Sequence, residues 1–442
     1  MIAPLLRTQY PEITFGEVFG GDMVALGIVK SRKITGGLIA GAAASAVFVS
    51  AGVGVPSSAN ASCFSIFGIG NSADCSSTLF GVAVAIGQGA TAHAAGFFGA
   101  SFSVGNGAGA TTSDAFTLAS AVGRNASAEA HGLLGLGLSI GGADNTVVAG
   151  APGSVLTVAS NWFGSNNSIT AEGGFWNRAA NYGGSNNTIT AQGSSFNHAR
   201  NILGRDNTIA TTNGYSNAAQ NFLGDGNTVT QTGGTGNAAK NFFGDGNSVT
   251  QTGGTVNFAK NLLGDGNTVT TTRGYGNFAR NRFGNRNSVT TEGGNFDLAS
   301  NLIGTGNTVA SQGGYYNRAR NIGGSSNGLS AGGTGSNLNF AYNVGGDGST
   351  VSVGGPGNIN AGFNFAGSNN HVAAGPGPLA LAGSIFQNGQ TVTKTGPGIV
   401  INNFRIGGAA STRGQTGTVD RSRAVPARAT ATTAAVNRHR NR

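Results

Sequence analysis

Polar and apolar residues recur along this chain with a constant period, so that Asn161, Asn181 and Asn201 are equivalent. From Asn161 onward an Asn occupies every twentieth position, a Gly follows three places later, and a second Asn lies six places later. Two residues beyond the second Asn comes Ile169 or its Val, Ile or Leu equivalent. A third polar column starts at Asn177, carries Asp297 in place of one Asn, and has Ala two residues further on. Sequence units of about 18 to 22 residues indicate a solenoid, a propeller or an array.

Short strands and Gly-rich turns account for one such unit. Runs such as NTVT and NSVT favour β-strands, because β-branched residues suit a pleated surface. Alternation puts Asn247 and Val249 on one face and Thr250 on the other. In NFAKNLLG, residues 257–264, the same alternation places Asn257, Ala259, Asn261 and Leu263 on one face of the chain. Two or three strands fit each coil, and stacked coils lie about 4.8 Å apart.

We therefore predict an all-β fold, a single-chain β-solenoid (β-roll or β-helix) of 18- to 22-residue coils. The earlier units are shorter, with Ile86, Val104, Val122 and Ile140 evenly spaced before Gly, whereas the units after residue 321 are slightly longer and less regular. About 17 coils would make a stack on the order of 80 Å long. The predicted parts are an N-terminal extension with a signal peptide (1–61), 18-residue coils (62–160), 20-residue Asn/Gly-rich coils (161–330), an irregular continuation (331–407) and a disordered Arg-rich tail (408–442).

The Asn and Gly columns have a structural explanation within this fold. A buried amide is costly unless its donor and acceptor are both used, and stacked Asn side chains satisfy one another along the axis. Gly supplies the positive φ angles that tight corners need. We interpret both columns as scaffold.

Composition and charge restrict the alternatives. The chain has 79 Gly and 9% charged residues, but its hydrophobic fraction of 38% argues against disorder as a whole. Residues 413–442 hold seven Arg and one Asp, so six of the nine net positive charges lie there. This tail either contacts an anionic polymer, a membrane or nucleic acid, or is a solvated extension with no dedicated partner.

The N-terminal region has the pattern of an export signal. Basic residues around Lys30 precede an apolar stretch, and Ala59, Asn60 and Ala61 form a small-x-small motif, which predicts cleavage before Ser62. We expect a secreted or cell-surface protein. The alternative is a membrane anchor formed by residues 34–55.

Cys63 and Cys75 are the two cysteines of the chain. In an exported protein such a pair favours a small-loop disulfide over a metal or catalytic site. We expect this bond to stabilise the start of the fold.

Part of the chain resembles the head repeats of trimeric autotransporter adhesins. Their pattern Ala-x-Ala-φ-Gly-x-x-Ala-x-Ala, in which φ is an apolar residue, is matched at Ala83, Ala85, Ile86, Gly87, Ala90 and Ala92, and again from Ala119 to Ala128. The resemblance covers residues 83–148 and implies a left-handed β-roll and adhesion.

Residues 161–320 resemble curlin repeats more weakly, through Gln231, Gly233, Asn237 and Ala239. That resemblance implies a self-assembling amyloid-like subunit, which is the alternative function. In composition the chain is also similar to secreted glycine/asparagine-rich repeat proteins of mycobacterial surfaces.

The sequence offers three kinds of candidate site. Asp225, Asp245 and Asp265 occupy one position in neighbouring coils and are weak calcium candidates, because carboxylate oxygens suit Ca²⁺. A carbohydrate-active solenoid enzyme is the second alternative, but Glu172 and Glu292 lie six coils apart and no nucleophile motif occurs. We expect no catalytic activity and no cofactor.

The third kind of site is a stripe of cations and aromatic rings. It consists of Arg200, Lys240, Lys260, Arg280, Arg320, Phe222 and Phe242. Such a stripe suits a surface polysaccharide, another anionic polymer or self-association. The competing interpretation is that the rings fill a coil corner and the cations keep the protein soluble. No specific nucleic acid or small molecule is indicated.

Overall fold

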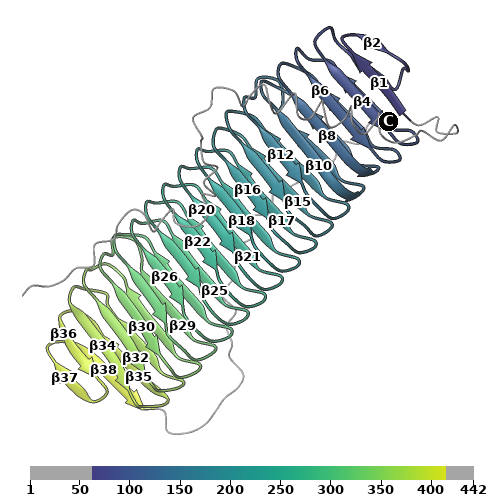
Figure 1. The fold of residues 1–442 in the computed structure, drawn as a ribbon. Helices are drawn as coiled ribbons and strands as arrows, with labels where there is room; N and C mark the ends of the chain where they lie inside the picture. The colour runs from purple at the N-terminus through teal and green to yellow at the C-terminus, as the bar shows by residue number, and fades with distance from the viewer. Residues whose placement is uncertain (1–61, 415–442) are drawn as a thin grey trace, which may run out of the picture. The chain divides into compact units, whose positions relative to one another are not determined.

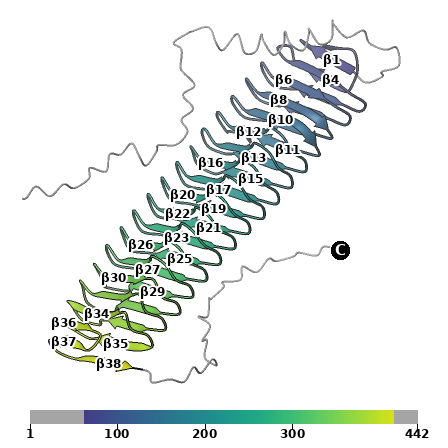
Figure 2. The ribbon, with the colours of Figure 1, turned by 60° about the horizontal axis from the view of Figure 1, so that its bottom comes forward.

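The computed structural model describes residues 62–414, which form an all-β solenoid of about 16 stacked coils (Figure 1). Each coil contributes one strand to each of two parallel sheets, named sheet A and sheet B. Figure 2 shows the even-numbered and odd-numbered strands in two rows along the stack. The predicted solenoid is confirmed, with two strands in each coil.

Sheet A consists of β1 (Ser62–Ile66), β2 (Ile69–Gly70), β4 (Val82–Ile86), β6 (Ala100–Val104), β8 (Leu118–Arg124), β10 (Leu136–Ala143), β12 (Val158–Asn161), β14 (Arg178–Asn181), β16 (His198–Asn201), β18 (Ala218–Asn221), β20 (Ala238–Asn241), β22 (Phe258–Asn261), β24 (Phe278–Asn281), β26 (Leu298–Asn301), β28 (Arg318–Asn321), β30 (Phe340–Val344), β32 (Ala361–Phe365), β34 (Ala380–Ile385), β36 (Gly398–Ile401) and β37 (Phe404–Ile406). Sheet B consists of β3 (Cys75–Ser77), β5 (Thr91–Ala94), β7 (Gly109–Thr112), β9 (Ser127–Ala130), β11 (Thr146–Ala149), β13 (Ser168–Glu172), β15 (Thr188–Gln192), β17 (Thr208–Thr212), β19 (Thr228–Thr232), β21 (Ser248–Thr252), β23 (Thr268–Thr272), β25 (Ser288–Glu292), β27 (Thr308–Gln312), β29 (Gly328–Gly332), β31 (Thr350–Gly354), β33 (His371–Ala374), β35 (Gln390–Lys394) and β38 (Ala410–Gly414).

The sequence period sets the register of both sheets. Each residue pairs with its equivalent in the next coil, as Ala239 does with Ala259 and Val249 with Val269. Sheet A therefore supplies a buried column of Ala to the core, and sheet B supplies a facing column of Val and Ile. Leu263, which alternation grouped with the core, is 38% exposed, so that expectation was wrong. The strand ends at Asn261 and the chain turns before Leu263.

The three Asn columns are buried, but they are bonded in two different ways. In the column of Asn241, each side-chain Nδ2 donates to the Oδ1 of the preceding coil, and the bond to Asn221 is 2.8 Å long. In the columns of Asn247 and Asn257 the Oδ1 accepts a backbone N–H, as Asn247 Oδ1 does from Asn267 at 2.9 Å, and at some steps it also accepts the Nδ2 of the next Asn, as Asn167 does from Asn187 at 3.1 Å. The predicted amide ladder is confirmed: it is continuous in the column of Asn241, and it occurs at single steps of the other two columns, whose side chains bond mainly to the backbone.

Antiparallel strands cover sheet A at both ends of the parallel stack and sheet B at the C-terminal end, whereas at the N-terminal end β3 is the edge strand of sheet B. At the N-terminal end β1 pairs antiparallel with β4, and β2 folds back onto β1. At the C-terminal end β37 pairs antiparallel with β36, and β38 with β35. The fold therefore continues past residue 407, where the sequence predicted the start of the tail, because β38 pairs with the edge of sheet B.

Both sheets run without a break through residues 160 and 330, where the repeat length changes. The signal peptide, its cleavage motif, the candidate anchor at 34–55 and residues 415–442 lie outside the described residues. Within residues 62–414 no helix is long and apolar enough to cross a bilayer.

Candidate functional site

The predicted cations lie on the outer face of sheet A. In β22, Phe258 and Lys260 point outward while Ala259 and Asn261 are buried, as the alternation of the strand requires. Register between coils then stacks the equivalent residues of neighbouring strands above one another. The five cations at this position are each half-buried: Arg200, Lys240, Lys260, Arg280 and Arg320.

The predicted aromatic residues accompany these cations at the ends of the strands. The rings of Phe222 and Phe242 stack with centroids 4.6 Å apart and planes 5° from parallel. Lys260 Nζ lies 4.3 Å from the centroid of the Phe242 ring. The structure thus brings the predicted residues of the stripe together. The ring faces point along the solenoid axis and toward the cations.

Four more basic residues on the same face were missed by the sequence analysis. Each lies two residues before or after the stripe position of its own coil: Arg178, His198, Arg282 and Arg318. Residues two apart in a strand point to the same side, so the alternation that placed Lys260 outside also predicts these positions. From β12 to β30 no Asp or Glu occupies an outward position of sheet A. Within residues 62–414 the one ion pair joins His131 to Glu129, so none of these cations is paired with a carboxylate.

Burial, and after it the neighbouring positive charges, lowers the pKa of several groups on this face. Burial lowers the pKa of Lys240, and burial followed by the charge of Arg280 lowers that of Lys260. Burial lowers the pKa of His198 to about 4, with Arg178 and Arg200 adding to the effect. His198 is therefore neutral at pH 7, while the surrounding residues form a strip of positive charge.

This strip contains a depression, which we call the arginine cleft. It has a volume of about 140 Å³ and lies over β26, between β24 and β28. Ser300 takes the stripe position there, so a short side chain stands where the adjacent coils have Arg280 and Arg320. The cleft is lined by Arg280, Arg282, Leu298, Ser300, Leu302, Arg318 and Arg320.

The calcium candidates form an exposed column on a turn. The carboxylate of Asp245 accepts the backbone N–H of Asp225 at 2.7 Å, and that of Asp265 accepts the N–H of Asp245 at 2.9 Å. One oxygen of each of these two carboxylates thus links neighbouring coils. Across residues 62–414 no group of three His, Cys, Asp or Glu has an arrangement that holds a metal ion.

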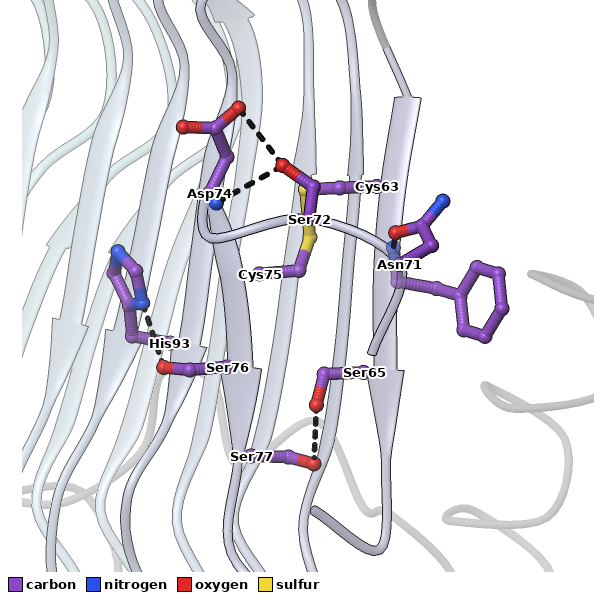
Figure 3. Close-up of a disulfide and its surroundings, with 10 residues drawn as sticks. Cys63, Ser65, Asn71, Ser72, Asp74, Cys75, Ser76, Ser77 and His93 are labelled. Carbon is purple, nitrogen blue, oxygen red and sulfur yellow. Dashed lines mark hydrogen bonds between the residues drawn. A yellow bond between two sulfur atoms is a disulfide. The ribbon is translucent and has the colours of Figure 1, made fainter. Parts of the chain in front are cut away.

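Cys63 and Cys75 form a disulfide, as predicted, with a Cα–Cα distance of 5.6 Å (Figure 3). It joins the covering strand β1 to β3, the first strand of sheet B, and both cysteines are buried. Beside it the hydroxyls of Ser65 and Ser77 are hydrogen-bonded at 2.8 Å. The disulfide therefore attaches the N-terminal cover to the stack.

The outer face of sheet B differs from that of sheet A. Thr and Ser dominate its outward positions from β13 to β27, and its charged residues are Glu172 and Glu292. Glu172 Oε2 accepts a hydrogen bond of 2.9 Å from Gln192. Searches of family models, of curated proteins and of solved structures found no match to this chain.

Proposed function

We propose that this chain is an exported structural or adhesive β-solenoid of the cell surface, without catalytic activity, whose cationic face of sheet A contacts a surface polysaccharide or another anionic polymer. The observation that carries the proposal is the repetition of unpaired cations along one face. Regular spacing of charge suits a polymeric ligand, which makes many weak contacts at once. The pattern of the N-terminal region and the disulfide support export.

The covered ends favour a discrete particle over the curlin-like alternative. An open parallel edge presents unpaired N–H and C=O groups to which another copy can add. Here β1 and β2 cover sheet A at one end, and β37 and β38 cover both sheets at the other, so the parallel edge left among the described strands is that of the three-residue β3. Another copy could add its coils to a covered edge only after these strands had dissociated from the sheets.

Electron microscopy and sedimentation of purified residues 62–442 test this part of the proposal. We expect single rods at micromolar concentration. A matched variant that ends at Ile401, and so lacks β37 and β38, should associate through the exposed edges. Spontaneous fibres of the intact protein would favour the amyloid alternative instead.

Cell fractionation with mass spectrometry of the protein tests its location. We expect a mature chain that begins at Ser62 in the surface or culture fraction. A chain that retains residues 34–55 in the membrane fraction would support the anchored alternative. Pull-down on immobilised acidic and neutral polysaccharides then tests adhesion, which we expect to be selective for the acidic polymers.

A further inference from the structure

We propose that the arginine cleft is a binding site for a tetrahedral oxyanion, a phosphate or sulfate group. The anion site itself does not depend on the adhesive function proposed above. The expectation that a polymer carries the anion rests on that function. The site differs from the remainder of the cationic face because four guanidinium groups from two coils surround one gap, whereas elsewhere the cations follow one another singly.

The register of sheet A creates this gap. Arg280 lies on β24 and Arg282 directly follows that strand, while Arg318 and Arg320 lie on β28, two strands further along. Two strand spacings separate the pairs by roughly 10 Å, which leaves room for one small anion within reach of both. Ser300 on β26 lies between them, and its hydroxyl is an additional donor to such an anion.

Within residues 62–414 no carboxylate and no hydrogen-bond acceptor engages these four guanidinium groups. Arg280 Nε and Arg318 Nε are buried and have no hydrogen-bond partner. Among the described residues no carboxylate lies within ion-pair distance of any of the four. Buried donors without partners are costly, and arginine forks match the oxygen geometry of phosphate and sulfate. An oxyanion in the cleft would accept hydrogen bonds from the terminal NH groups of the guanidinium groups that line it and would offset the repulsion among the four charges.

The rings beside the cleft favour an anionic group over a nucleobase, while the floor supplies one hydroxyl donor. Leu298 and Leu302 flank Ser300, so the floor is apolar on both sides of the hydroxyl. The nearby rings of Phe258 and Phe278 stack on each other at 5.1 Å, and Arg318 lies 5.6 Å from the centroid of the Tyr342 ring. Since single-stranded nucleic acids bind by stacking bases on free ring faces, the cleft is better suited to a group recognised by charge and hydrogen bonds without stacking.

Titration calorimetry of the full chain tests the site with inorganic phosphate and with sulfate, at constant ionic strength set by chloride. The decisive variant is Ser300→Arg, which fills the gap while it adds a positive charge. We expect phosphate binding to weaken about tenfold or more, through loss of charge-assisted hydrogen bonds. Arg280→Gln should weaken binding to a similar extent, and circular dichroism verifies that both variants fold.

The matched control is the double variant Lys240→Gln and Lys260→Gln, which removes two charges from the same face outside the cleft. It should change phosphate affinity less than twofold. Tighter binding by Ser300→Arg, an equal loss in the control, or no binding of either anion to the wild-type chain would overturn the proposal, because each outcome indicates a diffuse charge effect or no site.

A second arm uses dextran sulfate, polygalacturonate, neutral dextran and single-stranded DNA. We expect dextran sulfate to bind best and Ser300→Arg to weaken it. If the free anions bind and the polymers do not, the anion site stands and the adhesive function fails. If dextran sulfate binds the wild type and Ser300→Arg equally, adhesion stands and the cleft is not its site. Preferential binding of DNA would overturn the assignment to a ligand recognised without stacking.

Discussion

Asp297 provides a direct test of how the buried polar columns stabilise the coils. It replaces Asn in the column that includes Asn277 and Asn317, and it is fully buried. Its Oδ1 accepts the backbone N–H of Asn317 at 2.8 Å, but its Oδ2 has no partner. In the preceding coil the equivalent atom is the Nδ2 of Asn277, which donates to the Gly293 carbonyl at 2.8 Å. A carboxylate cannot donate in this way, whereas a protonated carboxyl can.

The protonation of Asp297 should therefore couple to folding. Burial raises its pKa from 3.8 to about 7, although the hydrogen bonds from Asn317 act in the opposite direction. Because the folded-state pKa is raised, the contribution to stability is fully present below the unfolded value and is lost as pH rises toward 7. A shift of about three units at 1.36 kcal/mol each corresponds to about 4 kcal/mol.

Asp297→Asn supplies the missing donor at every pH. We expect the variant to be more stable than the wild type by up to about 4 kcal/mol at pH 8 and to differ little at pH 4. Urea unfolding followed by circular dichroism at pH 4, 6 and 8 measures this difference.

The control places Asn277→Asp in the Asp297→Asn background, which moves the acid by one coil. It should restore the loss of stability at high pH. A gain from Asp297→Asn that is the same at pH 4 and pH 8, or no gain at pH 8, would refute the reasoning.

Three further perturbations address other parts of the scaffold. Replacing Cys63 and Cys75 by Ser removes a bond that closes a loop with a sequence separation of 12, so we expect a loss of about 3 kcal/mol and faster hydrogen exchange in the first coils. Asn241→Ala leaves a donor and an acceptor unpaired in the buried amide ladder and should cost about 2–5 kcal/mol in urea unfolding; a cost below about 0.5 kcal/mol, that of a surface change, would contradict it. Gly244→Ala, at φ 108°, forces a Cβ against the next coil and should lower the thermal midpoint far more than Gly246→Asn, at φ 61° with open space around it.

Much of the architecture followed from the sequence alone. A constant period with β-branched residues and Gly at fixed positions permits few folds, since only stacked coils put each residue beside its equivalent. Alternation identified the buried column of Val249 and the outward position of Lys260, because strand side chains point to opposite faces. The disulfide followed from two cysteines in a chain with an export pattern.

Tertiary structure decided what local pattern could not. Leu263 matched the alternation, but the turn after Asn261 carried it outside. Whether an Asn Nδ2 donates to another side chain differs even within one column, since Asn187 Nδ2 donates to Asn167 Oδ1 and Asn207 Nδ2 to the Gly224 carbonyl, and periodicity does not encode this difference. The arginine cleft arises because Ser300 lies between Arg280 and Arg320 only when the equivalent positions of successive coils are stacked. The sequence by itself determined the repeating coil, while the contacts between coils determined its ends, its bonding and the arginine cleft, where four guanidinium groups line one gap.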